Sequence, residues 1–145
     1  MINMGALQIL ESVRDIEQRI SSLREEKTRL RALATDTSAK PLDGMPYSNT
    51  GTVSQKLQDA AVKLVMLEHD IETEILRYIS YRNRAMELIR KLNDTEYGAL
   101  HRYYILGMTW ERTAEDMHYS TTQLWRIKNA AIDTLDEIIK NEGEN

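Results

Sequence analysis

The sequence contains no cysteine, which excludes disulfide bonds and thiolate chemistry. Phenylalanine is also absent, so the aromatic residues are 7 tyrosines and 2 tryptophans, which favour half-buried seams and partner surfaces. No apolar run approaches the length of a membrane-spanning helix, and the N-terminus lacks the basic start and apolar core of a signal peptide. We therefore expect a cytoplasmic protein that does not enter a membrane.

Motifs for catalysis and for metal binding are lacking as well. The histidines His69, His101 and His118 lie far apart, and neither an HExxH motif nor a cysteine accompanies them. Glu68, His69 and Asp70 are consecutive, but consecutive residues of a helix point in different directions and do not converge on one substrate atom. We expect no enzymatic activity, no metal and no cofactor.

The charge of the chain is acidic and unevenly distributed. The net charge of −4 argues against sequence-independent binding to nucleic acid, which depends on a basic surface. Residues 130–145 contain five acidic residues and one basic residue, so much of the acidic excess lies at the C-terminal end. At 145 residues, the chain is long enough for one ordinary domain or two small ones.

The first segment has the heptad pattern of a coiled coil. Its arginines alternate with as many acidic residues, which indicates a solvated helix face rather than a basic arm for DNA. Two sets of mostly apolar residues recur every seven positions, as coiled-coil d and a positions do: Ile2, Ile9, Ile16, Leu23 and Leu30, and Ala6, Val13, Ile20, Lys27 and Ala34.

Residues 35–53 interrupt that pattern, because both prolines and several Gly, Ser, Asn and Asp residues fall there. We expect a second long helix over residues 54–92, since seven-residue spacing separates Leu57, Leu64, Ile71, Tyr78, Ala85 and Leu92. Two long apolar helices joined by a loop predict an antiparallel, coiled-coil-like hairpin over residues 1–93. One hairpin does not fully cover both apolar faces, so we also expect a homodimer through the long helices.

Residues 94–140 predict a smaller helical domain, and residues 141–145 a polar tail. The first helix of this domain is expected over residues 95–106, with Asn93 before it and Gly107 as its C-cap. The predicted fold class is therefore all-α, with a long antiparallel helical hairpin followed by a C-terminal helix-turn-helix domain.

The stretch from residue 109 to residue 129 predicts two helices joined by a tight turn. Thr109 is placed to cap the first helix, and Ser120 forms a capping box with Gln123 at the start of the second. His118 stands in the turn, where the backbone tends toward positive φ. The residues expected to face the interior are Thr113, Ala114, Met117, Tyr119, Leu124 and Ile127.

The second of these helices would present a polar face that is suited to reading DNA. Arg126 is the best candidate for a base edge, because a guanidinium pairs with guanine O6 and N7. Lys128 and Arg112 are candidates for the phosphate backbone, and Trp125 would pack on the preceding helix or lie against sugars and thymine methyl groups. The candidate DNA-binding residues are Arg112, Ser120, Thr121, Thr122, Trp125, Arg126, Lys128 and Asn129. From spacing alone, an ordinary helical hairpin is an equal alternative.

Several short motifs in this region occur together: Arg102-Tyr103, Gly107, Thr109-Trp110-Glu111, Ala114, Tyr119-Ser120 and Trp125-Arg126-Ile127. This set resembles region 4 of bacterial sigma factors, which reads the −35 promoter element. It is more similar to phage-encoded late transcriptional regulators of Gram-positive hosts, the ArpU and RinA type, over about residues 40–138. The sequence departs from that family at Arg112 and Thr113, where glutamate and isoleucine are usual, and at His118, where glycine is usual.

The resemblance implies a phage-type transcriptional regulator that binds double-stranded DNA sequence-specifically and acts with host RNA polymerase in the bacterial cytoplasm. The acidic C-terminal end opposes DNA binding, so we expect polymerase or dimerisation to supply part of the affinity. Two alternatives stand beside this interpretation. One is a DNA-packaging adaptor of the small-terminase type, which would assemble into rings. The other is a helical protein-interaction module that does not bind DNA.

Overall fold

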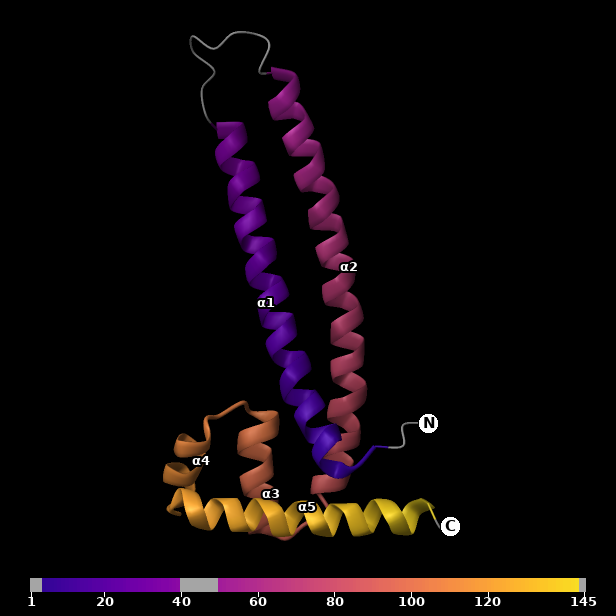
Figure 1. Ribbon diagram of the computed structural model, residues 1–145, viewed down its shortest axis with the longest axis vertical. Helices are drawn as coiled ribbons and strands as arrows, with labels where there is room; N and C mark the ends of the chain where they lie inside the picture. The colour runs from indigo at the N-terminus through magenta and orange to yellow at the C-terminus, as the bar shows by residue number, and fades with distance from the viewer. Residues whose placement is uncertain (1–3, 40–49, 144–145) are drawn as a thin grey trace. The chain divides into compact units, whose positions relative to one another are not determined.

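The computed structural model describes residues 4–39 and 50–143, and within these ranges it contains helices and no strand (Figure 1). This confirms the predicted all-α class. None of the helices in the described part is long and apolar enough to cross a membrane. The elements are α1 (Ala6–Ala39), α2 (Thr50–Ile89), α3 (Asp94–Leu100), the π-helical turn η2 (His101–Ile105), α4 (Trp110–Met117) and α5 (Thr121–Gly143).

Both long helices extend into the segment that the sequence predicts as a loop over residues 35–53. α1 continues to Ala39, and α2 begins at Thr50. The hydroxyl of Thr35 donates to the carbonyl of Arg31 at 2.9 Å, the bond that a threonine within a helix makes to the residue four positions before it. The predicted limits of the loop are therefore wrong, and the remaining part of the prediction, residues 40–49, lies outside the described residues.

Packing divides the chain into two compact units. Unit 1 comprises Met1–Glu17 and Arg77–Asn145, and unit 2 comprises Gln18–Leu76. Unit 1 thus joins the N-terminal turns of α1 and the C-terminal turns of α2 to the segment that the sequence predicts as a separate domain. Unit 2 holds the rest of the two long helices.

In unit 2, α1 and α2 run antiparallel and are linked by ion pairs. Arg19 Nη1 lies 3.5 Å from Glu74 Oε1, and Lys27 Nζ lies 2.9 Å from Glu68 Oε1. Residue numbers rise along α1 while those of the partners fall along α2, as in an antiparallel pair.

The apolar seam of unit 2 follows the predicted heptads but is shallow. Ile20, Leu67 and Ile71 are buried. The other heptad positions of this unit are half-buried, including Leu23, Leu30, Ala34, Leu57 and Leu64. Lys27 occupies a seam position and places its ammonium group on Glu68, so the stem of the side chain stays in the seam while its charge is paired.

Unit 1 has a core to which segments distant in the sequence contribute. Figure 1 shows α5 running across the N-terminal end of α1 and the C-terminal end of α2. Asp136 of α5 caps α1, because the Ala6 N–H donates to its Oδ1 at 2.9 Å. The core contains Ala6, Ile9, Leu10, Val13, Ala85, Met86, Leu88, Ile89, Leu100, Tyr104, Ile105, Ala131, Ile132 and Leu135.

The end of α5 is fixed to α2 and to the turn that follows it. Arg84 Nη2 donates to Glu142 Oε2 at 2.6 Å, and Lys91 Nζ donates to Glu142 Oε1 at 3.0 Å. These bonds lower the pKa of Glu142 to about 2. α5 consequently continues to Gly143, so residues 141–143, predicted to belong to a polar tail, are helical.

A π-helical turn replaces the end of the helix that the sequence predicts over residues 95–106. The Leu106 N–H donates to the carbonyl of His101, five residues earlier, at 2.9 Å. Arg14 of α1 donates to the Tyr103 carbonyl at 2.7 Å, which gives that carbonyl a partner other than a helical amide. A contact between residues so distant in the sequence explains why local patterns miss this widening of the helix.

Candidate nucleic-acid interface

The caps predicted for α4 and α5 are confirmed. Thr109 Oγ1 accepts from the Arg112 N–H at 3.1 Å at the start of α4. At the start of α5, the Ser120 N–H donates to Gln123 Oε1 at 2.9 Å, and the Gln123 N–H donates to Ser120 Oγ at 3.1 Å. This reciprocal pair is a capping box, and it fixes where α5 begins.

His118 forms the turn between the two helices in a left-handed conformation, with φ 61° and ψ 39°. The Tyr119 N–H donates to the Ala114 carbonyl at 2.9 Å, and the His118 N–H donates to the Glu115 carbonyl at 3.1 Å. These two bonds form a Schellman motif, in which glycine is the usual residue at the left-handed position. The prediction of positive φ at His118 is confirmed.

The predicted buried face is also confirmed, because none of its six residues is exposed. Ala114 and Leu124 form a small apolar cluster with Ala99, against which Trp110, Met117 and Ile127 pack. Thr113 is fully buried. It stands where isoleucine is usual in the ArpU and RinA type of regulator that the sequence resembles. Its hydroxyl donates to the Thr109 carbonyl at 2.8 Å, so this polar residue is accommodated without an unpaired group.

The opposite face of α5 is open to solvent. Its first turns contain no acidic residue, since none occurs between Asp116 and Asp133. Among the candidate DNA-binding residues, Lys128 is half-buried and Arg112 lies exposed on α4. The exposed candidates on and next to α5 are Ser120, Thr121, Thr122, Trp125, Arg126 and Asn129.

Two indoles and one ammonium group form an aromatic cluster beside this face. Lys128 Nζ lies 4.4 Å from the ring centroid of Trp125 and 5.6 Å from that of Trp110. Trp110 in turn meets the ring of Tyr103 edge-on, with 4.7 Å between centroids. Lys128 is therefore held over the rings by cation–π attraction instead of extending freely into solvent.

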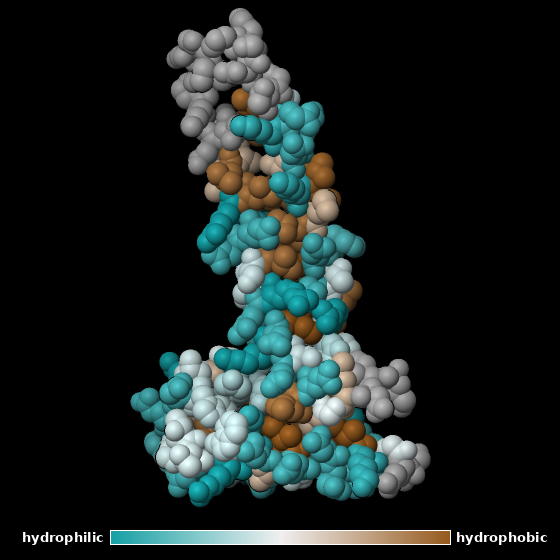
Figure 2. Space-filling model, viewed as in Figure 1, coloured by the Kyte–Doolittle hydropathy of each residue, from teal (hydrophilic) through white to brown (hydrophobic). Residues whose placement is uncertain are grey.

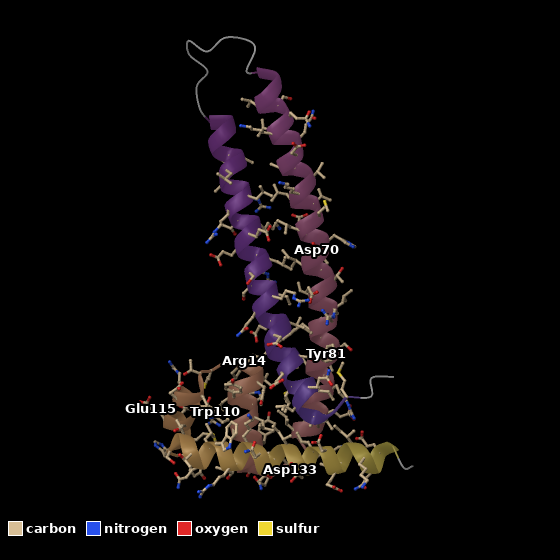
Figure 3. All side chains as sticks on the ribbon, in the orientation of Figure 1. Arg14, Asp70, Tyr81, Trp110, Glu115 and Asp133 are labelled. Carbon is tan, nitrogen blue, oxygen red and sulfur yellow. The ribbon has the colours of Figure 1, made fainter. Side chains whose placement is uncertain are left out.

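Arg14 supports the segment that leads into α4, a role that sequence patterns did not reveal. Its guanidinium donates to the carbonyls of Tyr103 at 2.7 Å and Met108 at 3.2 Å, and lies 4.2 Å from the centroid of the Tyr103 ring. Figure 3 shows Arg14 and Trp110 on the same side of unit 1. In the sequence, Arg14 resembles the other arginines of α1, and its partners lie 89 and 94 residues away.

Arg102 ties α4 to the helical segment before it. Its Nε donates to Asp116 Oδ2 at 2.6 Å, and its Nη1 donates to the Gly98 carbonyl at 3.1 Å. A Cβ atom at Gly98 would lie 2.7 Å from that Nη1. Glycine at this position therefore leaves room for the guanidinium.

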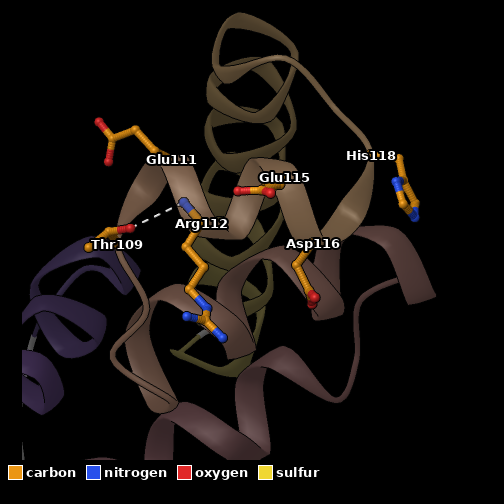
Figure 4. Close-up of a pocket in the computed structure, with 6 residues that line it drawn as sticks. All are labelled: Thr109, Glu111, Arg112, Glu115, Asp116 and His118. Atoms are coloured by element: carbon orange, nitrogen blue, oxygen red, sulfur yellow. Dashed lines mark hydrogen bonds between the residues drawn. The ribbon is translucent and has the colours of Figure 1, made fainter.

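An open groove of about 910 Å³ runs along α4 (Figure 4). Arg112 is the candidate DNA-binding residue that lines it, and three carboxylates lie around it. These acidic neighbours oppose a nucleic-acid phosphate, so this groove is a poorer site for DNA than the exposed face of α5. The lining residues are Thr109, Glu111, Arg112, Glu115, Asp116 and His118.

In the part of the chain that is described, no group of three or more His, Cys, Asp or Glu side chains is placed to hold a metal ion. Comparison with curated proteins and with solved structures finds no match. Residues 45–136 match the model of a family described as a protein of unknown function (DUF1492). Because this match spans more than half of the chain, the protein belongs to the DUF1492 family.

Proposed function

We propose that this protein is a phage-type transcriptional regulator that binds double-stranded DNA sequence-specifically through α5. The observation that carries this proposal is the exposed face of the first turns of α5, residues 121–132, which lies next to the capping box. These turns contain no acidic residue, although the protein as a whole is acidic and the later turns of α5 carry Asp133, Asp136 and Glu137. A DNA phosphate backbone meets no repelling carboxylate along this part of α5. The hydroxyl, amide and guanidinium side chains of this face are suited to hydrogen bonds with base edges.

The roles of the candidate residues follow from their chemistry and exposure. Arg126 is assigned to a guanine edge, because its side chain offers a bidentate donor. Thr121, Thr122 and Asn129 are assigned to bases or phosphates, and Ser120 lies at the helix start where backbone amides favour an anion. Lys128 adds positive charge from its place over the indoles. Arg112 is assigned a minor phosphate contact, since the acidic residues of the α4 groove surround it.

Host RNA polymerase is the proposed partner of the DNA-bound protein. The motifs that resemble sigma factor region 4 support this partner, as analogy. The net charge of −4 supports it as well, because an acidic protein gains little affinity from phosphate neutralisation and depends on a further contact. Such a regulator would work in the bacterial cytoplasm.

A homodimer through the long helices is part of the same proposal. On α2 within unit 2, the side chains of Val62, Val65, Met66 and Leu76 are 60%, 66%, 60% and 69% exposed. We call this set the outer face of α2. Val62 lies nine residues from the buried Ile71, which is two and a half turns of helix, so the outer face is opposite the seam. A helix with apolar residues on both sides is typical of a larger bundle.

Selection of bound sequences from a random pool of duplex DNA tests the DNA-binding proposal. We expect a defined site, and we expect Arg126→Ala to lose about 1–3 kcal/mol of discrimination at one guanine. Arg24→Ala is the matched control, because it removes the same charge from an exposed position on α1. A pool without enrichment, or equal effects of both variants on matched and scrambled sites, would contradict the assignment.

Sedimentation equilibrium tests the dimer separately. Val65→Glu should produce a monomer, because it places a charge on the outer face of α2, whereas Ser22→Glu on the polar outer side of α1 should leave the dimer intact. A monomeric wild-type protein at high concentration would contradict the dimer. Ring-sized assemblies would instead favour the DNA-packaging adaptor.

A further inference from the structure

Trp125 is the large apolar side chain on the otherwise mostly polar exposed face of α5. Its side chain is 52% exposed, although indole is among the largest apolar groups that a protein can bury. The neighbouring Leu124 is fully buried, so α5 does have an interior face that would accept a large apolar residue. Its companions on the exposed face, Thr121, Thr122, Arg126 and Asn129, are all polar.

Lys128 covers one side of the Trp125 ring. The Lys128 ammonium lies 4.4 Å from the Trp125 centroid and is also within 5.6 Å of the Trp110 centroid. Trp110 packs against the apolar cluster that includes Ala114 and Leu124, so Lys128 is attached to a rigid part of the unit. One side of the Trp125 ring is thus occupied, and this contact favours one orientation of the indole, which reduces the entropy lost on binding.

The chemistry of duplex DNA narrows what such a ring can recognise. In the major groove, guanine, cytosine and adenine present hydrogen-bonding groups at their edges, whereas thymine adds an apolar C5-methyl group. An indole has a single N–H donor and no strong acceptor, so its ring makes its best contact with that methyl group. The face of a base becomes available for stacking only when the base is unpaired.

We propose that Trp125 recognises the C5-methyl group of a thymine in the major groove, with Lys128 as the positioning residue that holds the indole. This inference rests on the proposed DNA-binding function of α5. It adds that one chemical group of the DNA, a thymine methyl group, is recognised by an apolar side chain. If Trp125 reads this methyl group, the DNA site must contain an A·T pair at one position, with the thymine always on the same strand.

Base analogues test this inference on the full-length protein. In the duplex site selected by the wild type, each thymine is replaced in turn by deoxyuridine, which lacks only the methyl group. We expect about a 3–5-fold loss of affinity at one position of each recognised half-site, as appropriate for one buried methyl group. Trp125→Ala should bind thymine and uracil equally at that position, and 5-methylcytosine there should bind the wild type more tightly than cytosine.

Two further variants keep the test decisive. Leu106→Ala is the matched control, because Leu106 is 56% exposed but lies outside α5, and it should keep the thymine–uracil difference. Trp125→Leu, checked by circular dichroism, covers the case in which Trp125→Ala disturbs the fold. If a site is selected but uracil is tolerated at every position, or if Trp125 variants keep the difference, the inference is overturned while DNA binding stands. A preference for single strands also overturns it, and absence of any selected site overturns both proposals.

Discussion

Unit 1 and unit 2 contain parts of the same two helices but are stabilised differently. In unit 1, α1 and α2 share a fully buried core with α3, η2 and α5, and polar side chains such as Arg14 and Asp136 make directed bonds to backbone groups. In unit 2, the two helices meet along a seam with few buried side chains, and charges link them across it. Figure 2 shows apolar side chains at the surface of the two-helix part.

The difference teaches that a heptad pattern predicts which side of a helix faces a partner, but not how deeply that side is buried. Two helices alone exclude water from a seam only partly, whereas a third helix crossing their ends closes it. Unit 1 is thus stabilised by a closed core of its own, whereas the proposed dimer would supply the further apolar burial that unit 2 lacks.

The largest expected effect comes from the same substitution, leucine to alanine, made on α2 once in unit 1 and once in unit 2. Leu88 in unit 1 is 0% exposed, and Leu67 in unit 2 is 8% exposed. Leu88→Ala should lower the free energy of unfolding by about 2–5 kcal/mol, because it leaves a cavity in a closed core. Leu67→Ala should cost less, since the seam can close or admit water. Urea unfolding followed by circular dichroism measures both, and equal losses would contradict the comparison.

The directed contacts of unit 1 are tested at Gly98. Gly98→Ala places a Cβ 2.7 Å from Arg102 Nη1, the end of a flexible side chain, so it should shift the guanidinium and weaken its bonds to Asp116 and to the Gly98 carbonyl. This loss, of up to about 1 kcal/mol for a partly exposed ion pair, offsets the gain of alanine over glycine in a helix, so we expect little net change in the free energy of unfolding. In an Arg102→Ala background, the same change should raise the free energy of unfolding by about 1 kcal/mol, because only the helix preference of alanine remains. A double-mutant cycle in thermal unfolding gives the coupling, and additive effects would show that Arg102 does not need the glycine.

Two histidine-to-glycine changes should act with opposite signs in the two units. His118→Gly should raise the free energy of unfolding by about 0.5–1 kcal/mol, because glycine adopts the left-handed conformation of the α4–α5 turn without a steric cost. His69→Gly lies within α2 of unit 2 and should lower it by about 1 kcal/mol. Melting temperatures report both changes. A loss of stability in His118→Gly would mean that its imidazole contributes to the turn.

The smallest expected effect concerns two carboxylates that each lie between two basic groups. Arg84 and Lys91 lower the pKa of Glu142 to about 2, and Lys27, with a smaller effect from Arg31, lowers the pKa of Glu68 below its ordinary value of 4.5. A lowered folded-state pKa means that the stabilisation is present above the ordinary pKa and is lost as the pH falls toward the folded-state value.

The pH dependence of the free energy of unfolding therefore compares the two units, because Glu142 lies in unit 1 and Glu68 in unit 2. Between about pH 5 and pH 2, the wild-type protein should lose stability, and Glu142→Gln should show a flatter dependence over the whole of that range. Glu68→Gln should flatten it less, because the contact of Arg31 with Glu68 is long, at 3.8 Å. Urea midpoints at several pH values measure both slopes. Identical profiles for wild type and Glu142→Gln would show that these bonds do not persist in solution.

The sequence by itself determined the features of this protein that depend on neighbours within about one turn of helix. The cap at Thr109, the capping box at Ser120, the left-handed turn at His118 and the buried and exposed faces of α5 all follow from side chains three to seven residues apart. The candidate face on α5 was therefore predictable, residue by residue. The limits of the loop were not, because weak helix formers such as Thr35 extend a helix that already exists.

The tertiary structure decided which of several similar residues have a specific partner. Arg14 and Arg24 look alike in the sequence, yet Arg14 binds the carbonyls of Tyr103 and Met108. Tertiary packing also places Asp136 at the start of α1 and the ring of Trp110 from α4 beside Lys128 of α5. The physical reason is that such bonds join groups close in space but distant along the chain, so they exist only after the apolar core has brought their helices together.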